Sequence, residues 1–434
     1  MFKEKNYISK FFNICFKNLK SEDIFYKSYN KVFRYKDVGI FYHKFLFFLS
    51  KFKKDRKKII VISNKRFELY ASIISIIVSK NIWVPINPSF PKIRVQKIID
   101  KINPDFLIIE SLKNKSSESI IKICKKKKIK VIDFLTIKRI KSTKFDIIIK
   151  KVNSEDIAMI FFTSGSTGEP KGVKINYRGF LHSMYEQERI LFKNKKNLIF
   201  GDYHDSSFVI SLNILLLCFL TKNILSPSTN PYDSVMPINH IEKNQVNVLI
   251  TVPSTILRIQ KYIKEKKIKN NFELIIMCGE PFHLKLYEFI LRSFKSKKIF
   301  NCYGSTELSP WVFSHKCERK KIYEYEKYAM IPIGKPFNFT NTMIRKKELL
   351  ISGKMLSSGY LNSDENKNKF IKISNQLWYR TGDVAKITNN EFTIKGRLDK
   401  IIKVKGYRVD LMEIEKYIRD FDTNIRDVIC FSKY

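Results

Sequence analysis

The stretch FTSGSTGEPKGV, residues Phe162–Val173, decides how this 434-residue chain is interpreted. It continues an apolar run over residues 157–162 that predicts a buried strand, and it gathers three glycines, four hydroxyl side chains and one lysine. Glycine lets a backbone approach a ligand closely, while hydroxyls, amide N–H groups and a lysine ammonium donate to phosphate oxygens. The stretch therefore predicts a loop that closes over a polyphosphate.

This loop differs from two familiar phosphate motifs. The Walker P-loop ends in Gly-Lys-Ser/Thr, whereas here Lys171 precedes Gly172 and no Ser or Thr follows. The spacing is not G-x-G-x-x-G either, which argues against a dinucleotide fingerprint. A solvated Gly/Ser turn is the simpler alternative for a motif this short.

The composition is that of a globular chain with more than one domain, at 44% hydrophobic and 28% charged residues. A net charge of +41 would suit a nucleic acid or an anionic membrane. The lysines are spread along the chain, however, as an AT-rich coding sequence would produce. We therefore assign the charge to composition and expect no nucleic-acid partner.

The seven cysteines form no C-x-x-C pair, which predicts reduced thiols in a cytoplasm, without a disulfide framework or structural zinc. No signal-peptide pattern is evident at the N-terminus. The longest apolar stretch, residues 208–220, is too short to span a bilayer. We expect a cytoplasmic monomer with no transmembrane segment.

Predicted strands alternate with predicted helices over the first three hundred residues, as at 58–63, 67–79 and 81–85, which indicates a parallel sheet covered by helices. From residue 331 onward, short β segments punctuated by glycine predict a small barrel or sheet subdomain. Polar turns follow three of the apolar strands. Because ligands bind at the carboxyl ends of strands in open α/β sheets, these turns are expected to meet at one cleft.

Three charged residues in such turns suit a nucleotide. Glu307 can hold Mg²⁺, a cation that prefers carboxylate and phosphate oxygens. Asp383 follows a Thr-Gly turn and can accept both ribose hydroxyls, and Arg397 can donate to a ribose or an α-phosphate. Each alone would more often be a cap or a solvated charge, so their occurrence together carries the interpretation.

With these segments in order, the chain resembles the adenylate-forming superfamily of acyl-CoA synthetases, luciferases and amino-acid adenylation domains. The matching segments are residues 162–173, 303–307, 379–383 and 396–415. The resemblance implies an α/β fold with a large N-terminal domain, residues 1–396, made of two parallel sheets flanked by helices plus a small β-subdomain. An incomplete small α+β C-terminal lobe would follow over residues 397–434.

Such enzymes activate a carboxylate with ATP and Mg²⁺, giving an acyl-adenylate and pyrophosphate, and a thiol then attacks the adenylate. The resemblance implies that a loop of Thr163, Ser164, Gly165, Ser166, Thr167, Gly168 and Lys171 holds the β- and γ-phosphates. Tyr303, beside Gly304, would stack on adenine, Thr306 would touch the α-phosphate, and Glu307 would serve Mg²⁺. Asp383 and Arg397 would bind ribose. Asp399 lies where these enzymes hinge the C-terminal lobe between half-reactions.

Two positions suggest which carboxylate is activated. Asp205 lies in His204-Asp205-Ser206-Ser207, where amino-acid-activating members carry Phe-Asp-x-Ser and pair the aspartate with the substrate ammonium. A buried carboxylate there would penalise a fatty acid, because the carboxylate would be left unpaired. Asp205 could instead cap the following helix, and His204 departs from the usual phenylalanine.

The second position is Cys278, in Cys-Gly-Glu where Gly-Gly-Glu is common. This is similar to the D-alanine–carrier-protein ligases, in which the cysteine narrows the pocket; a small buried hydrophobe is the alternative. The resemblance implies a small amino acid as substrate, D-alanine favoured, and a phosphopantetheinylated carrier protein as partner. An acyl- or aryl-CoA synthetase and a degenerate nucleotide-binding remnant remain as alternatives.

The family's C-terminal lobe carries a lysine in an Asn-Gly-Lys-type turn, but no glycine follows Gly406 here. We therefore expect a truncated lobe. Adenylation would then be impaired, or a separate polypeptide would complete the lobe, or the lysine would be dispensable.

Overall fold

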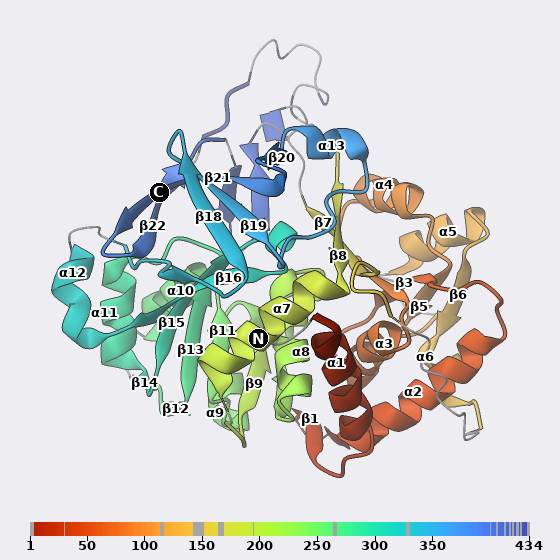
Figure 1. The fold of residues 1–434 in the computed structure, drawn as a ribbon. Helices are drawn as coiled ribbons and strands as arrows, with labels where there is room; N and C mark the ends of the chain where they lie inside the picture. The colour runs from red at the N-terminus through yellow and green to blue at the C-terminus, as the bar shows by residue number, and fades with distance from the viewer. Residues whose placement is uncertain are drawn as a thin grey trace. The chain divides into compact units, whose positions relative to one another are not determined.

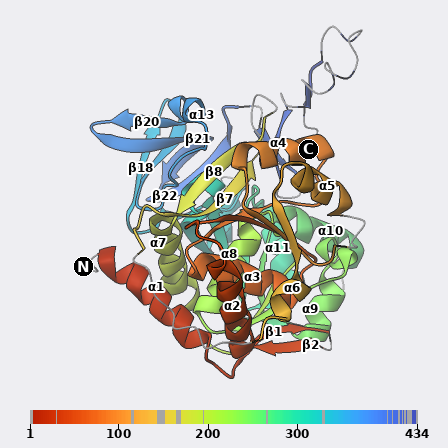
Figure 2. The ribbon, with the colours of Figure 1, turned by 90° about the vertical axis from the view of Figure 1, so that its right-hand side faces the viewer.

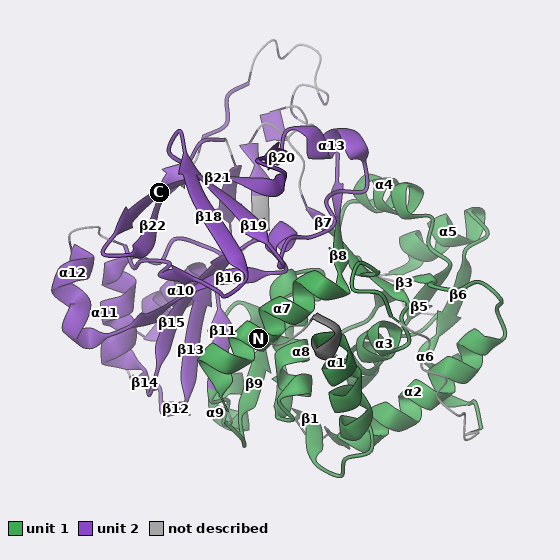
Figure 3. Cartoon of the chain, in the orientation of Figure 1, with its two compact units in different colours: residues 1–161, 174–247 green, residues 162–173, 248–434 purple. Residues whose placement is uncertain are grey.

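The computed structural model forms two compact units, residues 1–161 with 174–247 and residues 162–173 with 248–434 (Figure 3). The structure describes residues 4–29, 31–112, 117–141, 152–163, 169–193, 195–263, 267–326, 330–399, 401–404, 407–411, 414–415, 418, 421, 425 and 428–431.

The first unit contains most of a sheet of strand order β6-β5-β3-β4-β7-β8 (Figure 1). Residues 162–163 of β7 and 171–173 of β8 belong to the second unit. The registered pairs from β6 to β7 are all parallel. The strands are β3 (Lys58–Ile62), β4 (Ile82–Pro85), β5 (Phe106–Ile109), β6 (Lys130–Asp133), β7 (Ile157–Thr163) and β8 (Lys171–Asn176). β3 reads KIIVI and β5 reads FLII, and nearly all of these residues are buried, as in parallel sheets covered on both faces.

The helices of this region follow from their apolar patterns. In α3 (Phe67–Val78) every residue except Glu68 is buried, which suits a helix that is apolar all round. In α4 (Lys92–Ile102) the buried residues are Val95, Ile98, Ile99 and Ile102, the i, i+3, i+4, i+7 spacing of one helix face. α4 packs beside α5 (Glu118–Lys126), as Figure 2 shows. The unit also holds α2 (Tyr35–Ser50) and α6 (Phe134–Lys138).

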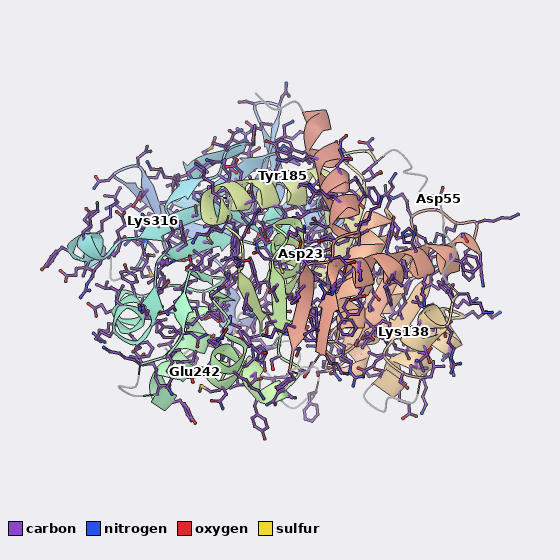
Figure 4. The ribbon with its side chains drawn as sticks, turned by 90° about the horizontal axis from the view of Figure 1, so that it is seen from below. Asp23, Asp55, Lys138, Tyr185, Glu242 and Lys316 are labelled. Carbon is purple, nitrogen blue, oxygen red and sulfur yellow. The ribbon has the colours of Figure 1, made fainter. Side chains whose placement is uncertain are left out.

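Four further strands of the first unit pair in the order β9-β10-β1-β2. β9, β10 and β1 are parallel, and β2 closes the edge antiparallel to β1. α1 packs against α7, where the Tyr185 hydroxyl, labelled in Figure 4, donates to the Tyr7 carbonyl at 3.0 Å. The elements are α1 (Glu4–Asn18), β1 (Ile24–Ser28), β2 (Lys31–Arg34), α7 (Tyr177–Gln187), β9 (Ile199–Asp202), α8 (Val209–Leu220), β10 (Ile224–Pro227) and α9 (Ile238–Asn244).

The second unit begins with three parallel strands in the order β11-β13-β15, followed by antiparallel β16 and β17. α10 and α11 pack beside each other in this unit. The elements are β11 (Val248–Thr251), α10 (Pro253–Ile263), β12 (Asn271–Phe272), β13 (Leu274–Cys278), α11 (Leu284–Ser293), β14 (Lys295–Ser296), β15 (Ile299–Gly304), β16 (Trp311–Cys317), α12 (Ile322–Glu326) and β17 (Lys335–Pro336).

An antiparallel sheet of order β18-β19-β21-β20, with β22 on β21, forms the small β-subdomain of the second unit. Its elements are β18 (Thr340–Arg345), β19 (Glu348–Gly353), α13 (Ser363–Lys367), β20 (Phe370–Ile373), β21 (Gln376–Thr388) and β22 (Glu391–Arg397). Three two-residue hairpin loops have positive φ at both positions, the pattern of type I′ turns. β23 (Ile401–Val404) and β24 (Tyr407–Asp410) form a separate hairpin.

The structure confirms the predicted fold class, with parallel sheets flanked by helices and a small β-subdomain. It differs from the sequence prediction at the sheet edges, where β2, β16 and β17 run antiparallel. It also places Lys171 at the start of strand β8 rather than within a loop. The division at residues 396 and 397 stays a prediction. Among the described helices, none is long and apolar enough to cross a membrane.

Candidate functional site

Four predicted site residues of the second unit are joined by direct contacts. The Tyr303 hydroxyl, at the end of β15, donates to Asp383 Oδ2 at 2.5 Å, and Arg397 Nη1 lies 2.5 Å from Asp383 Oδ1. Arg397 also forms a two-point ion pair with Asp399, in which Nε donates to Oδ1 at 2.6 Å and Nη2 donates to Oδ2 at 2.8 Å. Lys369 Nζ lies 3.6 Å from the same Asp399 carboxylate. Charges therefore alternate along Asp383, Arg397, Asp399 and Lys369.

The turn that presents Asp383 is fixed by two buried neighbours. The Thr381 hydroxyl accepts from the Asp383 N–H at 3.0 Å and donates to the Leu349 carbonyl at 2.7 Å. The Thr381 carbonyl accepts from Arg397 Nη2 at 3.1 Å. Glu348, also buried, accepts from the Gly382 N–H at 2.9 Å. These bonds hold Asp383 and Arg397 through contacts within the protein, which is the arrangement that preorganised sites use.

Gly382 is required by two features of this turn. Its φ of +76° lies in the left-handed region, and a Cβ there would meet Arg397 Nη2 and Asp399 Oδ2, each at 2.7 Å. Any side chain would therefore strain the backbone and press on the ion pair. The Thr-Gly-Asp sequence thus packs the guanidinium directly against the turn.

Tyr303 is held as a neutral donor. Burial, followed by the neighbouring Asp383 carboxylate, raises the pKa of the Tyr303 phenol well above its ordinary value. Its ring also meets Phe313 edge-on, with centroids 5.7 Å apart. Gly304 follows it, where a Cβ would lie 1.9 Å from the Pro310 carbonyl oxygen, so the chain needs glycine there. Thr306 is half-buried in the short 3₁₀ turn that comes next.

Two more predicted site residues meet at Tyr360. Glu307 is fully buried, and its Oε1 accepts from the Tyr360 hydroxyl at 2.8 Å. Lys171 Nζ lies 6.0 Å from the centroid of the same tyrosine ring. Tyr360 also forms an antiparallel bridge with Val173, so it touches the segment that follows the predicted phosphate loop. One side chain thus contacts both the lysine and the carboxylate.

These residues fit Mg²⁺ only as part of a nucleotide complex. Glu307 supplies a hard carboxylate, and its Oε1 accepts from the neutral Tyr360 hydroxyl. Within the described ranges there is no group of three or more His, Cys, Asp and Glu side chains that could hold a metal. Mg²⁺ commonly uses one or two carboxylates plus substrate phosphates and waters, so a single carboxylate is compatible with that mode.

The central part of the predicted phosphate loop is not described. Ser164, Gly165, Ser166, Thr167 and Gly168 lie outside the described residues. Thr163 ends strand β7 and is half-buried.

Asp205 lies in the first unit and forms a local turn. Its Oδ1 accepts from the Ser207 backbone N–H at 2.7 Å and from the Ser207 hydroxyl at 2.5 Å. The N-cap of α8 is Phe208, so Asp205 caps the turn before the helix rather than the helix itself. A carboxylate has about four lone-pair sites, so these bonds leave acceptor capacity on the side chain.

The turn containing Asp205 follows a buried ion pair between Asp202 and Lys65, which the sequence did not predict. Asp202 has no exposed surface, and its Oδ1 lies 3.4 Å from Lys65 Nζ. Asp202 Oδ2 accepts from Tyr70 at 2.7 Å and from Ser211 at 2.9 Å. Burial lowers the pKa of Lys65, while the nearby Asp202 opposes that shift. The aspartate in the stretch preceding Asp205 was the only sequence signal for this pair.

Cys278 ends strand β13 in the second unit and is fully buried. Its Sγ lies 3.7 Å from the Thr251 carbonyl oxygen, and burial raises the pKa of the thiol to about 12. The side chain is therefore a neutral, small group at neutral pH. Glu280, two residues on, accepts from the backbone N–H and hydroxyl of Ser254, at 2.8 and 3.0 Å.

The chain is similar in sequence to known proteins. The family model described as AMP-binding enzyme matches residues 48–361. D-alanine--D-alanyl carrier protein ligase of Staphylococcus epidermidis is 28% identical over 360 residues, 81% of this chain and 70% of that protein. The Staphylococcus aureus (strain MRSA252) protein of the same name is 28% identical over 347 residues, 78% of this chain and 67% of that protein.

Solved structures show the same fold. The Vibrio cholerae adenylation domain AlmE, in complex with glycyl-adenosine-5'-phosphate, superposes with a TM-score of 0.83 at 19% identity, covering 97% of this chain and 84% of that chain. Bacillus subtilis o-succinylbenzoate CoA synthetase, MenE, gives a TM-score of 0.79 at 16% identity, covering 94% and 82%. Because the family model matches well over half of the sequence, the chain belongs to the AMP-binding enzyme family.

Proposed function

We propose that this chain is an ATP- and Mg²⁺-dependent ligase that activates a small amino acid, D-alanine favoured, and passes it to a carrier-protein thiol. In the first step a carboxylate oxygen bonds to the α-phosphorus of ATP, and the bond to the pyrophosphate leaving group breaks. In the second step a phosphopantetheine sulfur bonds to the carbonyl carbon, and AMP leaves. Adenylate formation and ligation follow from the family, and to these we add the substrate and the acceptor.

The linked Tyr303, Asp383 and Arg397 carry the nucleotide part of this proposal. Their spacing is set by hydrogen bonds of 2.5 Å on each side of the Asp383 carboxylate. That carboxylate has acceptor sites left for two ribose hydroxyls. Arg397 brings a fixed fork of donors, which suits an anionic phosphate as well as a ribose oxygen.

Glu307 and Lys171 would serve the polyphosphate end. When bound, Mg²⁺ would neutralise charge that develops on the phosphates. Glu307 would hold it through a carboxylate oxygen, and Lys171 would donate to phosphate oxygens as a point charge. Thr163, Ser164, Gly165, Ser166, Thr167, Gly168 and Thr306 would complete the phosphate contacts.

Asp205 and Cys278 support an amino acid as the substrate. A carboxylate on a rigid turn can pair with an α-ammonium, and the Ser207 bonds give Asp205 that rigidity. A buried cysteine at the end of β13 suits a narrow pocket for a small side chain. The names of the Staphylococcus relatives support D-alanine and a carrier protein as the two partners.

ATP–pyrophosphate exchange on the purified chain tests the proposal. The panel is D-alanine, L-alanine, glycine, leucine, acetate and a medium-chain fatty acid, with isotope incorporation into ATP as the readout. We expect exchange with a small amino acid, strongest with D-alanine. Exchange with the fatty acid alone would overturn the amino-acid assignment while leaving adenylation standing. A chain that binds neither ATP nor AMP would overturn the nucleotide assignment.

The second candidate is an acyl- or aryl-CoA synthetase. It is favoured by the fold shared with Bacillus subtilis MenE and by the local turn that already engages Asp205. Under that function the carboxylate of Asp205 would be a structural cap only. The same panel with benzoate added separates the two functions, because acetate, the fatty acid or benzoate would then support exchange.

A further inference from the structure

Tyr360 contacts two separate parts of the proposed phosphate site. Its hydroxyl donates to Glu307 Oε1 at 2.8 Å, while its ring faces the Lys171 ammonium at 6.0 Å. The two partners lie more than one hundred residues apart in the sequence. The segment around Tyr360 contacts the backbone at Glu307 and beside Lys171, and Tyr360 is placed to orient both side chains.

The backbone of Tyr360 is fixed on both sides. It forms an antiparallel bridge with Val173, and the next residue, Leu361, donates its N–H to the Gly172 carbonyl at 2.7 Å. The Tyr360 N–H donates to Asn366 Oδ1 at 2.8 Å. The start of β8 and the tyrosine therefore hold a common register, with Lys171 two residues from the bridge.

The side chain of Tyr360 has equally little freedom. It is 2% exposed, and its ring meets Phe370 edge-on at 5.7 Å between centroids. The backbone of Glu307 is also held in place, because its carbonyl accepts a hydrogen bond from the Ser357 N–H at 2.9 Å. The Tyr360 hydroxyl helps to orient the buried Glu307 carboxylate, since a rotamer that moved Oε1 away would break this bond.

We propose that Tyr360 is a positioning residue that sets Glu307 and Lys171 at the separation needed for a metal-bound polyphosphate. The hydroxyl orients the carboxylate, and the ring stabilises the ammonium through a cation–π contact. This inference rests on the proposed function. It adds to the proposed phosphate site a positioning residue that lies outside the motifs that predicted the site. It predicts that the two effects of Tyr360 can be separated by substitution.

Isothermal titration calorimetry with MgATP, with ATP in EDTA and with AMP tests this. Tyr360→Phe removes only the hydroxyl, so we expect about a tenfold loss of MgATP affinity, with the affinities for metal-free ATP and AMP within twofold of the wild type. Tyr360→Leu removes the ring too, so metal-free ATP should also bind more weakly. AMP lacks the β- and γ-phosphates and reports on the ribose and adenine end alone.

Tyr325→Phe is the matched control. Tyr325 is also a buried tyrosine of the second unit, and its hydroxyl lies 2.8 Å from His315 Nε2. Removing that hydroxyl should lower the melting temperature without changing any of the three affinities. A double-mutant cycle adds Glu307→Gln, in whose background Tyr360→Phe should have little further effect on MgATP binding.

Three outcomes would overturn the inference. MgATP affinity of Tyr360→Phe equal to that of Tyr325→Phe would remove the positioning role. An equal loss of AMP and MgATP affinity, or a Tyr360→Phe protein unfolded at the assay temperature, would show that the hydroxyl serves the fold. A wild-type chain that binds neither ATP nor AMP would instead refute the proposed function itself.

Discussion

The Arg397 guanidinium and the Asp399 carboxylate form a two-point ion pair, with bonds of 2.6 and 2.8 Å. The same guanidinium contacts Asp383 through Nη1. Arg397 therefore links Asp383, which is predicted to bind ribose, to Asp399, which is predicted to act as a hinge. Because a planar guanidinium can hold two carboxylates at fixed angles, a movement of Asp399 would shift the position of Asp383.

Arg397→Lys should weaken AMP binding by about tenfold, because an ammonium cannot replace the fork that spans both carboxylates. Calorimetry with AMP is the measurement. Arg178→Lys is the control, since Arg178 makes a similar two-point pair with Glu155 in the first unit, at 2.5 and 3.3 Å. An Arg397→Lys protein that binds AMP like the wild type would show that the fork is not needed.

Gly382→Ala should lower both stability and AMP affinity. Left-handed backbone costs a residue with a Cβ about 1–2 kcal/mol, and the new methyl would also press on Arg397 and Asp399 at 2.7 Å. Gly396→Ala is a matched control, because Gly396 also has positive φ, +151°, but a Cβ there meets nothing within 4 Å. Urea unfolding and AMP titration should show a stability loss in both variants and an affinity loss in Gly382→Ala alone. Equal AMP affinities in the two variants would contradict the contact argument.

Much of the fold follows from local pattern. The apolar runs KIIVI and FLII form buried strands, and the i, i+3, i+4, i+7 spacing of α4 forms its buried face. The β-subdomain was predicted from glycine punctuation, yet three of its hairpin loops contain no glycine. They are Lys346-Lys347, Ser374-Asn375 and Asn389-Asn390, all with positive φ. Lys-Lys carries no turn preference of its own, so only the strand register demands that conformation.

Residues of the candidate site that lie in short motifs could be predicted from the sequence. Residues whose roles depend on contacts between distant segments could not. Asp383 and Arg397 were identified from their turns, but the bond from Tyr303 to Asp383 joins residues 80 positions apart. Tyr360 and Lys65 were missed, because a tyrosine after glycine or a lysine after asparagine is common in any chain. Their importance lies in partners that the sheet topology brings together.

Asp205→Asn should separate the structural role of Asp205 from the proposed binding role. An asparagine Oδ1 can still accept from the Ser207 N–H, so the turn and the melting temperature should be nearly kept. The negative charge is lost, so we expect amino-acid-dependent ATP–pyrophosphate exchange to fall at least a hundredfold.

Asp205→Ala removes both charge and turn acceptor, and should lower exchange and stability together. ATP binding measured by calorimetry should be unchanged in both variants. Full amino-acid-dependent exchange activity in Asp205→Asn would mean that the carboxylate is only a cap and does not pair with the substrate ammonium.

The stability of the chain should fall as the pH is lowered through the range set by His240. This imidazole is 3% exposed, its Nδ1 lies 3.0 Å from the Tyr203 hydroxyl, and burial lowers its pKa to about 4 despite the nearby Asp233 carboxylate. An unfolded histidine has a pKa near 6.5, so the unfolded chain binds more protons between these values. The contribution of His240 is therefore complete above pH 6.5 and is lost progressively toward pH 4.

Urea unfolding at pH 7 and pH 5 measures this effect. Between these two values His240 should account for about 2 kcal/mol of lost stability. His240→Gln cannot be protonated, and its amide can still bond the Tyr203 hydroxyl, so this variant should lose less stability than the wild type over that interval by the same amount. His283→Gln, at an exposed position, should behave like the wild type. If His240→Gln kept the full pH dependence, the titration would have to reside in other groups, since the His240 imidazole would then bind protons equally in the folded and the unfolded chain over this interval.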